Sequence, residues 1–126
     1  MTTALWCILI AALLPYAGTG LAKIGGRMSP KANHSPRDWL EKLEGWPKRA
    51  HWAQLNSFEV FPAFAAAVIV ATITHAPQGK LDELAMAFIA FRLAYLVMYL
   101  ANLAPLRTLC WTGGTVCMVW LFLLGA

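Results

Sequence analysis

Four long stretches of this sequence contain almost no Asp, Glu, Lys or Arg. They cover residues 1–22, 50–79, 84–106 and 108–126. A hydrocarbon core about 30 Å thick is crossed by roughly 18 to 20 apolar residues, and backbone polar groups inside lipid must be satisfied within a helix. The chain is therefore predicted to cross a membrane four times, with helices near 4–24, 48–75, 81–104 and 107–125.

The composition agrees with burial in lipid. The 126 residues are 60% hydrophobic and 13% charged, which lies beyond the usual mix of a soluble domain. No stretch has a polar stripe wide enough to face water, so a soluble helical bundle is excluded. Tight connections near Pro77 and Pro105 make consecutive helices antiparallel neighbours. The prediction is a single all-α domain, 1–126, folded as an integral membrane four-helix bundle.

A cleaved signal peptide is the alternative interpretation of the first stretch. This stretch is N-terminal and ends in small residues around Ala17 to Ala22. It has no basic segment before the apolar run, and the run is long for a signal peptide. These features favour a retained membrane span.

The net charge of +4 is concentrated in and beside the first connection between helices. Lys and Arg accumulate in cytoplasmic loops, so this connection is expected to be cytoplasmic and both termini to lie on the far side. Membrane lipids with anionic headgroups are the expected partner, and nucleic acid is not. The basic residues concerned are Lys23, Arg27, Lys31, Arg37, Lys42, Lys48 and Arg49.

The first connection also contains a predicted short helix, 36–44. Ser35 has the properties of a capping residue, Pro36 suits the first helical position, Asp38 is an acid in the first turn, and Gly45 indicates a stop. Two interpretations stay open: a helix anchored at the headgroup level, or a lid over a site that faces the cytoplasm. Its apolar face would consist of Trp39, Leu40, Leu43 and Trp46.

The cysteines and histidines show no metal-ligand spacing, so no metal site or disulfide is expected. The cysteines lie inside predicted spans and read as small packing residues, whereas the histidines lie near loops or helix ends. They are Cys7, Cys110 and Cys117, and His34, His51 and His75.

Two charged residues inside the spans, Glu59 and Arg92, are the first candidates for function, because charge in lipid is costly. They lie at similar depth on adjacent antiparallel helices, which predicts an ion pair. Helical spacing adds Trp52 and Asn56 to the face of Glu59, and Tyr95, Tyr99 and Asn102 to that of Arg92. With Arg107 at its mouth, such a cleft suits a small polar or anionic ligand. The alternative is that these residues only hold helices together.

The run from Trp52 to Pro62 contains Ala-x-x-Asn-x-x-Glu-x-x-Pro, and the next span contains Arg92-Leu93-Ala94-Tyr95 followed by Tyr99. Together these resemble the MAPEG family, the membrane-associated proteins in eicosanoid and glutathione metabolism, in a short prokaryotic-type form. The resemblance implies a homotrimer in a bacterial inner membrane. It also implies glutathione as cofactor and a transferase or peroxidase activity on lipophilic small-molecule electrophiles.

Site residues follow from the same resemblance. Arg107 is the candidate catalytic residue, because a cation beside a thiol stabilises the thiolate nucleophile. The sequence departs from the family in carrying Trp52 where glutathione-using members resemble one another in having Arg. A similar Arg-Ala-His run begins three residues earlier, at Arg49. A non-enzymatic protein that binds lipid or a partner therefore stays open. The candidate glutathione ligands are Gln54, Asn56, Glu59, Arg92, Tyr95 and Tyr99.

Overall fold

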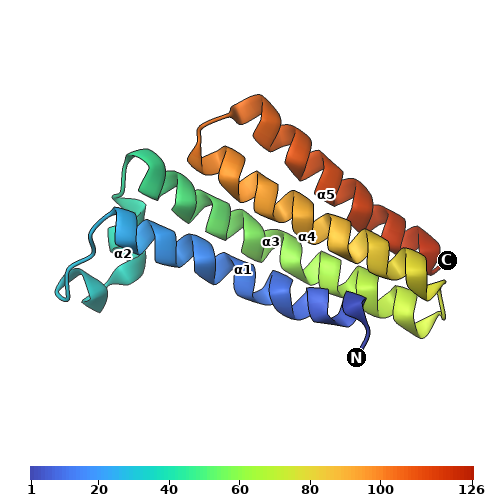
Figure 1. Ribbon diagram of the computed structural model, residues 1–126. Coiled ribbons are helices and arrows are strands. Elements are labelled where there is room, and N and C mark those ends of the chain that lie inside the picture. The colour runs from blue at the N-terminus through green and yellow to red at the C-terminus, as the bar shows by residue number, and fades with distance from the viewer.

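The computed structural model of the protein describes residues 1–126 and consists of helices without strands. Four helices are long and apolar enough to cross a membrane. They lie side by side, with the short helix α2 at one end of the bundle and both termini at the other (Figure 1). The elements are α1 (Thr3–Gly25), the 3₁₀ turn η1 (Ala32–His34), α2 (Pro36–Glu41), α3 (Gly45–Ile73), α4 (Gln78–Leu100) and α5 (Ala104–Leu124).

These bounds confirm the four predicted spans and shift their ends. Gly45 begins α3 instead of ending the loop helix, so α2 stops at Glu41. Gly45 has a φ of 66°, a left-handed conformation that glycine adopts freely, and this lets the chain turn sharply into α3. The helices α4 and α5 each begin three residues earlier than predicted, and Pro105 lies in the first turn of α5. Ser35 occupies the predicted capping position of α2, but its side chain makes no capping hydrogen bond.

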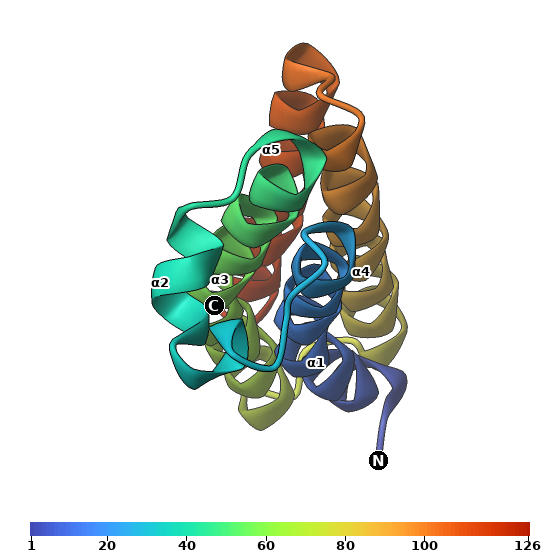
Figure 2. The same ribbon diagram turned by 90° about the vertical axis from the view of Figure 1, so that its left-hand side faces the viewer.

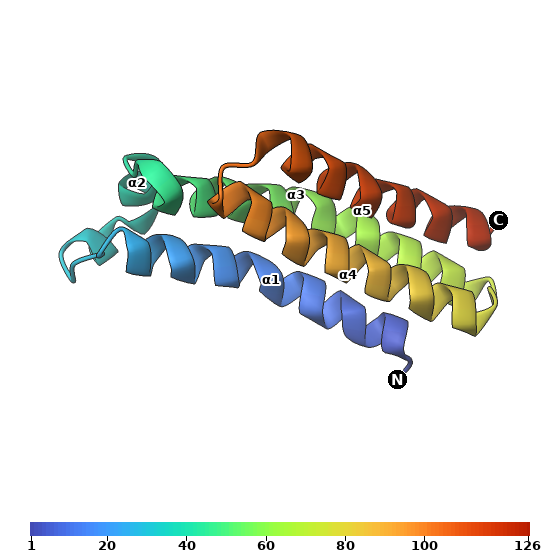
Figure 3. The same ribbon diagram turned by 45° about the horizontal axis from the view of Figure 1, so that its top comes forward.

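The core runs along the inner faces of the four long helices. Its centre is the stacked pair Phe64 and Phe88, whose ring centroids are 3.9 Å apart. Around it are small side chains that let helix backbones approach closely, among them Ala67, Ala71 and Ala85. The helix α5 packs against α4 on the side away from α1 (Figure 3) and buries only Gly114, Cys117 and Leu121.

Polar contacts fix both ends of the bundle. At the end that carries the termini, the Asp82 carboxylate on α4 accepts a hydrogen bond from the Ala4 backbone N–H at 2.7 Å. At the other end, Arg49 of α3 donates from Nε and Nη2 to the Leu100 carbonyl of α4, at 3.3 and 3.0 Å. Arg49 therefore satisfies a carbonyl at the C-terminal end of α4, which has no partner within its own helix.

The connection between α1 and α3 crosses over one end of the bundle (Figure 2). Leu40 of α2 is buried in a small cluster with Ala22 and Ala50. The Trp39 side chain occupies the space that a Cβ at Gly26 would need, and the Trp46 side chain occupies the space that a Cβ at Gly25 would need. The apolar face of α2 thus packs onto the ends of α1 and α3, so it is committed to protein contacts.

Gly18 marks the closest approach of α1 to α3. A Cβ at Gly18 would lie 3.1 Å from both the Ala50 carbonyl oxygen and the Gln54 Cβ, whereas a Cβ at Gly20 meets nothing within 4 Å. We expect Gly18→Val to lower the free energy of unfolding by about 1–3 kcal/mol through overpacking. The matched variant Gly20→Val should cost clearly less. Thermal unfolding in detergent measures both, and equal losses would contradict the packing described for α1 and α3.

Candidate functional site

A groove on the outer surface of the bundle, toward the end that carries α2, collects most of the predicted site residues. Two adjoining cavities of about 470 and 230 Å³ share Asn56, Tyr95 and Tyr99. We call this continuous feature the tyrosine groove. Its walls are Trp52, Leu55, Asn56 and Glu59 of α3, Tyr95 and Tyr99 of α4, and Arg107, Thr108 and Trp111 of α5. The three- and four-residue spacings on each helix place these side chains on one face.

The two tyrosines of the groove are held between two cations. The Arg92 guanidinium lies 4.3 Å from the Tyr95 ring centroid, and the Arg107 guanidinium lies 4.5 Å from the Tyr99 ring centroid. The two rings meet edge to face at 5.5 Å. Cation–π contacts stabilise such pairs by about 0.5–2 kcal/mol, more where water is excluded. The ring positions are therefore set before any ligand arrives.

Asn56 and Glu59 supply acceptors along the α3 side of the groove. The Asn56 amide nitrogen donates to Glu59 Oε2 at 3.4 Å. The side-chain oxygen of Asn56, Oδ1, is buried and accepts no hydrogen bond within the chain. A buried polar atom without a partner is costly, so this oxygen is suited to a donor from outside the chain. The α3 side of the groove favours a ligand with N–H groups.

The predicted ion pair between Glu59 and Arg92 is wrong within the chain. Arg92 is 3% exposed and donates from Nη2 to the Ser57 hydroxyl at 3.1 Å. Glu59 is exposed, and none of the four ion pairs includes it. The reason is rotation about the α3 axis: Ser57 faces inward, and Glu59 lies two residues, or about 200°, further round. Arg92 lies behind Tyr95 and does not line the groove.

Gln54 and Arg49 also lie apart from the tyrosine groove. Gln54 packs against Gly18 of α1 and its side-chain oxygen lies 3.3 Å from His51 Nδ1. Arg49 is engaged with the Leu100 carbonyl. Arg107 is consequently the one guanidinium that lines the groove, and it has no carboxylate or carbonyl partner in the chain.

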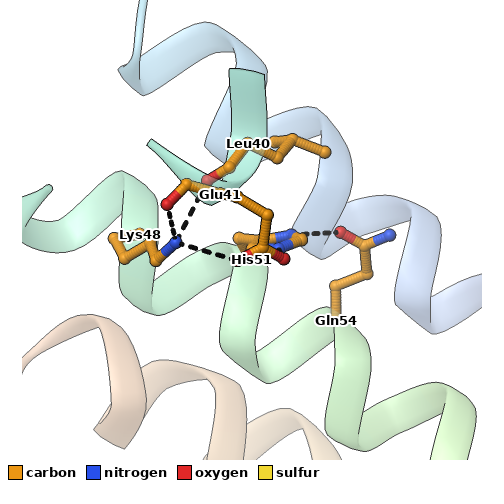
Figure 4. A network of polar contacts seen from close by, with 5 residues as sticks. All are labelled: Leu40, Glu41, Lys48, His51 and Gln54. Atoms are coloured by element: carbon orange, nitrogen blue, oxygen red, sulfur yellow. Dashed lines mark hydrogen bonds and ion pairs between the residues drawn. The ribbon is translucent and has the colours of Figure 1, made fainter. Parts of the chain in front are cut away.

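A polar network joins α2 to α3 (Figure 4). Glu41 Oε1 lies 3.0 Å from Nε2 of His51, a ring that is 4% exposed. Lys48 Nζ lies 3.4 Å from Glu41 Oε2 and also donates to the Glu41 carbonyl oxygen. The hydrogen bond from His51 and the charge of Lys48 lower the pKa of the Glu41 carboxyl below its usual value. This network holds α2 over the ends of the helices.

Several groove residues were not predicted from the sequence as site residues. Thr108 and Trp111 follow Arg107 at spacings of one and four, so helical periodicity alone could have placed Trp111 beside it. Ser57 does not line the groove, but its contact with Arg92 was also not predicted; its only signal was a lone hydroxyl in an apolar span two residues before Glu59. Hydroxyls in spans usually bond to their own helix, and Ser57 also donates to the Ala53 carbonyl.

The bundle and its groove define a class, the small four-span membrane proteins with a polar cleft toward one end. A comparison with known protein families matches residues 3–126 to the MAPEG family. The match covers essentially the whole chain, so this protein belongs to the MAPEG family. Among curated proteins, none matches the sequence significantly.

The contact between Ser57 and Arg92 gives a prediction about stability. Ser57→Ala removes the partner of a buried guanidinium, so it should lower the free energy of unfolding by about 1–3 kcal/mol. In an Arg92→Met background the same change should cost much less, because no buried donor is left unpaired. Denaturation of the four proteins in mixed detergent measures the difference. An identical cost of Ser57→Ala in both backgrounds would show that the contact contributes nothing.

The Glu41 network gives a prediction about pH. Because folding lowers the pKa of Glu41 from its usual 4.5, the contact stabilises α2 above that pH and is lost as the pH falls through the folded value. Hydrogen-exchange protection of residues 36–41, corrected for the intrinsic rate, should decrease as the pH is lowered below 4.5. Glu41→Gln should abolish this dependence, whereas Asp38→Asn, on the exposed side of α2, should keep it. Protection that is unchanged in acid in the unmodified protein would contradict the assignment.

Proposed function

We propose that the protein is a membrane glutathione transferase that joins the thiol of glutathione to lipophilic electrophiles in the tyrosine groove. The observation that carries this proposal is the position of Arg107. Its guanidinium has no anionic partner, lies over Tyr99, and lines the same groove as Asn56 and Glu59. A free cation and free acceptors thus share one cleft.

Most of the polar groups of glutathione can be paired with a residue of the groove. The larger cavity, about 470 Å³, lies within the usual range for small-molecule sites. The ammonium and amide N–H groups of glutathione suit Glu59 and the unpaired Asn56 oxygen. Arg107 can hold a carboxylate or the thiolate. The second carboxylate has no free cation of this chain in the groove, because Arg49 caps α4 and Arg92 lies behind Tyr95.

The proposed reaction is nucleophilic. The glutathione thiol first loses its proton to water. The thiolate sulfur then forms a bond to an electrophilic carbon, and the leaving group departs with its electron pair. A cation beside the sulfur favours the thiolate, which is the role assigned to Arg107. The exposed apolar walls, Trp52, Leu55 and Trp111, offer the electrophile a path from the bilayer.

The proposal includes a location and an assembly. The location is the inner membrane of a bacterium, with the groove toward the cytoplasmic side, where glutathione is available. The basic first connection supports this orientation. The groove is open along the outer surface of the chain, between helices that leave large apolar side chains exposed. A homotrimer would let a neighbouring subunit close it and cover part of that surface.

Trp52 favours a second candidate, a non-enzymatic MAPEG protein that binds a lipid or a partner. The Trp52 indole is 45% exposed at the groove wall, and its ring centroid lies 6.5 Å from that of Tyr99. Lys48 Nζ lies 5.6 Å from the centroid of the Trp52 ring. An indole gives the groove an apolar edge where a carboxylate needs a cation. This candidate predicts a groove that accepts an apolar ligand and leaves glutathione unbound.

The role of Arg107 can be tested by titration. The purified protein should bind glutathione and increase the ultraviolet absorption of its thiolate at neutral pH. Arg107→Gln should weaken binding by about ten- to 150-fold, since a charge-assisted hydrogen bond contributes about 1.5–3 kcal/mol, and should remove the thiolate signal. Arg37→Gln, an equal loss of charge at an exposed position of α2, serves as control. Thiolate absorption that survives Arg107→Gln would contradict the role given to Arg107.

Trp52→Arg should strengthen glutathione binding, because it adds a guanidinium at the edge of the groove within one turn of Asn56. The expected gain is about 1–3 kcal/mol, or roughly five- to 150-fold. Trp52→Gln removes the indole without adding charge and is the matched control. Thermal stability is measured on all three proteins. A stable Trp52→Arg protein whose affinity does not rise would contradict glutathione binding at this edge.

A further inference from the structure

A second cavity lies at the end of α1 and shares no residue with the tyrosine groove. Its volume is about 560 Å³. It is formed where α1 ends and the chain enters the loop toward η1. This end of α1 lies at the same end of the bundle as α2 (Figure 1). We call it the loop pocket. It is lined by Lys23, Ile24, Arg27, Met28, Ser29, Pro30 and Asn33.

The loop pocket offers cations and hydrogen-bond donors and contains no carboxylate. Lys23 and Arg27 take part in none of the four ion pairs of the protein. Ser29 Oγ accepts a hydrogen bond from the Ala32 backbone N–H, which leaves its own proton free to donate. Asn33 adds an exposed side-chain amide. Such a set matches the oxygens of a phosphate group.

The ending of α1 brings the two cations to one place. The Met28 N–H donates to the Lys23 carbonyl at 3.0 Å, which closes the last turn of α1. Arg27 takes the left-handed conformation, with a φ of 55°, in that turn. The chain therefore reverses around the helix end, and Lys23 and Arg27 face the same cavity.

The remaining walls are apolar and indicate what kind of phosphate is bound. Ile24 is 77% exposed, although it sits directly beside Lys23. Ile24 is the last residue but one of α1, a helix that is long and apolar enough to cross a membrane, so we expect it where acyl chains meet headgroups. A cation pair at this depth with an exposed Ile24 below it suits a ligand that has a phosphate and an acyl chain.

We propose that the loop pocket binds the headgroup phosphate of an anionic phospholipid through Lys23 and Arg27, with Ser29 and Asn33 as further donors. One acyl chain of this lipid lies along Ile24. The site is separate from the proposed glutathione site, so either can fail without the other. It anchors the end of α1, against which Trp39 of α2 and Trp46 of α3 are packed.

The test is native mass spectrometry of the full-length protein titrated with phosphatidylglycerol and, separately, with phosphatidylcholine. The unmodified protein should prefer phosphatidylglycerol. Lys23→Gln with Arg27→Gln should weaken phosphatidylglycerol binding by about tenfold or more, as expected for two cations at a membrane surface. Lys31→Gln with Arg37→Gln removes the same charge from exposed positions outside the pocket and should change binding little.

A second variant keeps the test decisive if the double substitution prevents folding. Asn33→Asp places a carboxylate on the exposed wall of the pocket and should weaken phosphatidylglycerol binding through repulsion.

Three outcomes would overturn the proposed lipid site. Equal losses of affinity in the pocket and control variants would show diffuse attraction of the lipid to basic residues. Equal binding of both lipids would overturn it too. Complete displacement of the lipid by inorganic phosphate would show that the pocket recognises free phosphate, which also contradicts the proposal.

Discussion

The protein depends on one constraint of the bilayer, which is that a polar group in hydrocarbon needs a partner within the protein. Arg92 shows this most clearly, because its buried guanidinium donates from Nη2 to the Ser57 hydroxyl and lies against the face of Tyr95, while its Nε is left without a hydrogen-bond partner in the chain. Those contacts set the rotation of α3 and α4 about their axes. The same rotation brings Asn56, Glu59, Tyr95 and Tyr99 together along the tyrosine groove.

Hydropathy predicted the four spans because twenty-residue apolar segments have few alternatives in a membrane. Helical spacing also brought Asn56, Glu59, Tyr95 and Tyr99 together correctly. It failed for the pairing of Glu59 with Arg92, since depth along a helix says nothing about rotation around it. Ser57 was a closer partner on the buried face. The number and position of charges in the sequence could not reveal that Arg49 donates to the Leu100 carbonyl, because this contact depends on where α4 ends.

Most of the basic residues of the protein lie at the end of the bundle that carries α2. Basic residues that look alike in the sequence divide into distinct roles there. Arg49 caps α4, Lys48 contacts Glu41, Arg107 lies over Tyr99, and Lys23 and Arg27 line the loop pocket. Their common position beside the headgroups explains the charge concentration, and their individual partners decide which of them can bind a ligand.

The structure of the protein determined in a lipid bilayer with glutathione present tests the central claim most directly. We predict density for the tripeptide in the tyrosine groove, with its sulfur beside the Arg107 guanidinium and its N–H groups directed at Asn56 and Glu59. A tyrosine groove filled by an acyl chain or by a side chain of a neighbouring subunit, with no density for glutathione, would contradict the claim.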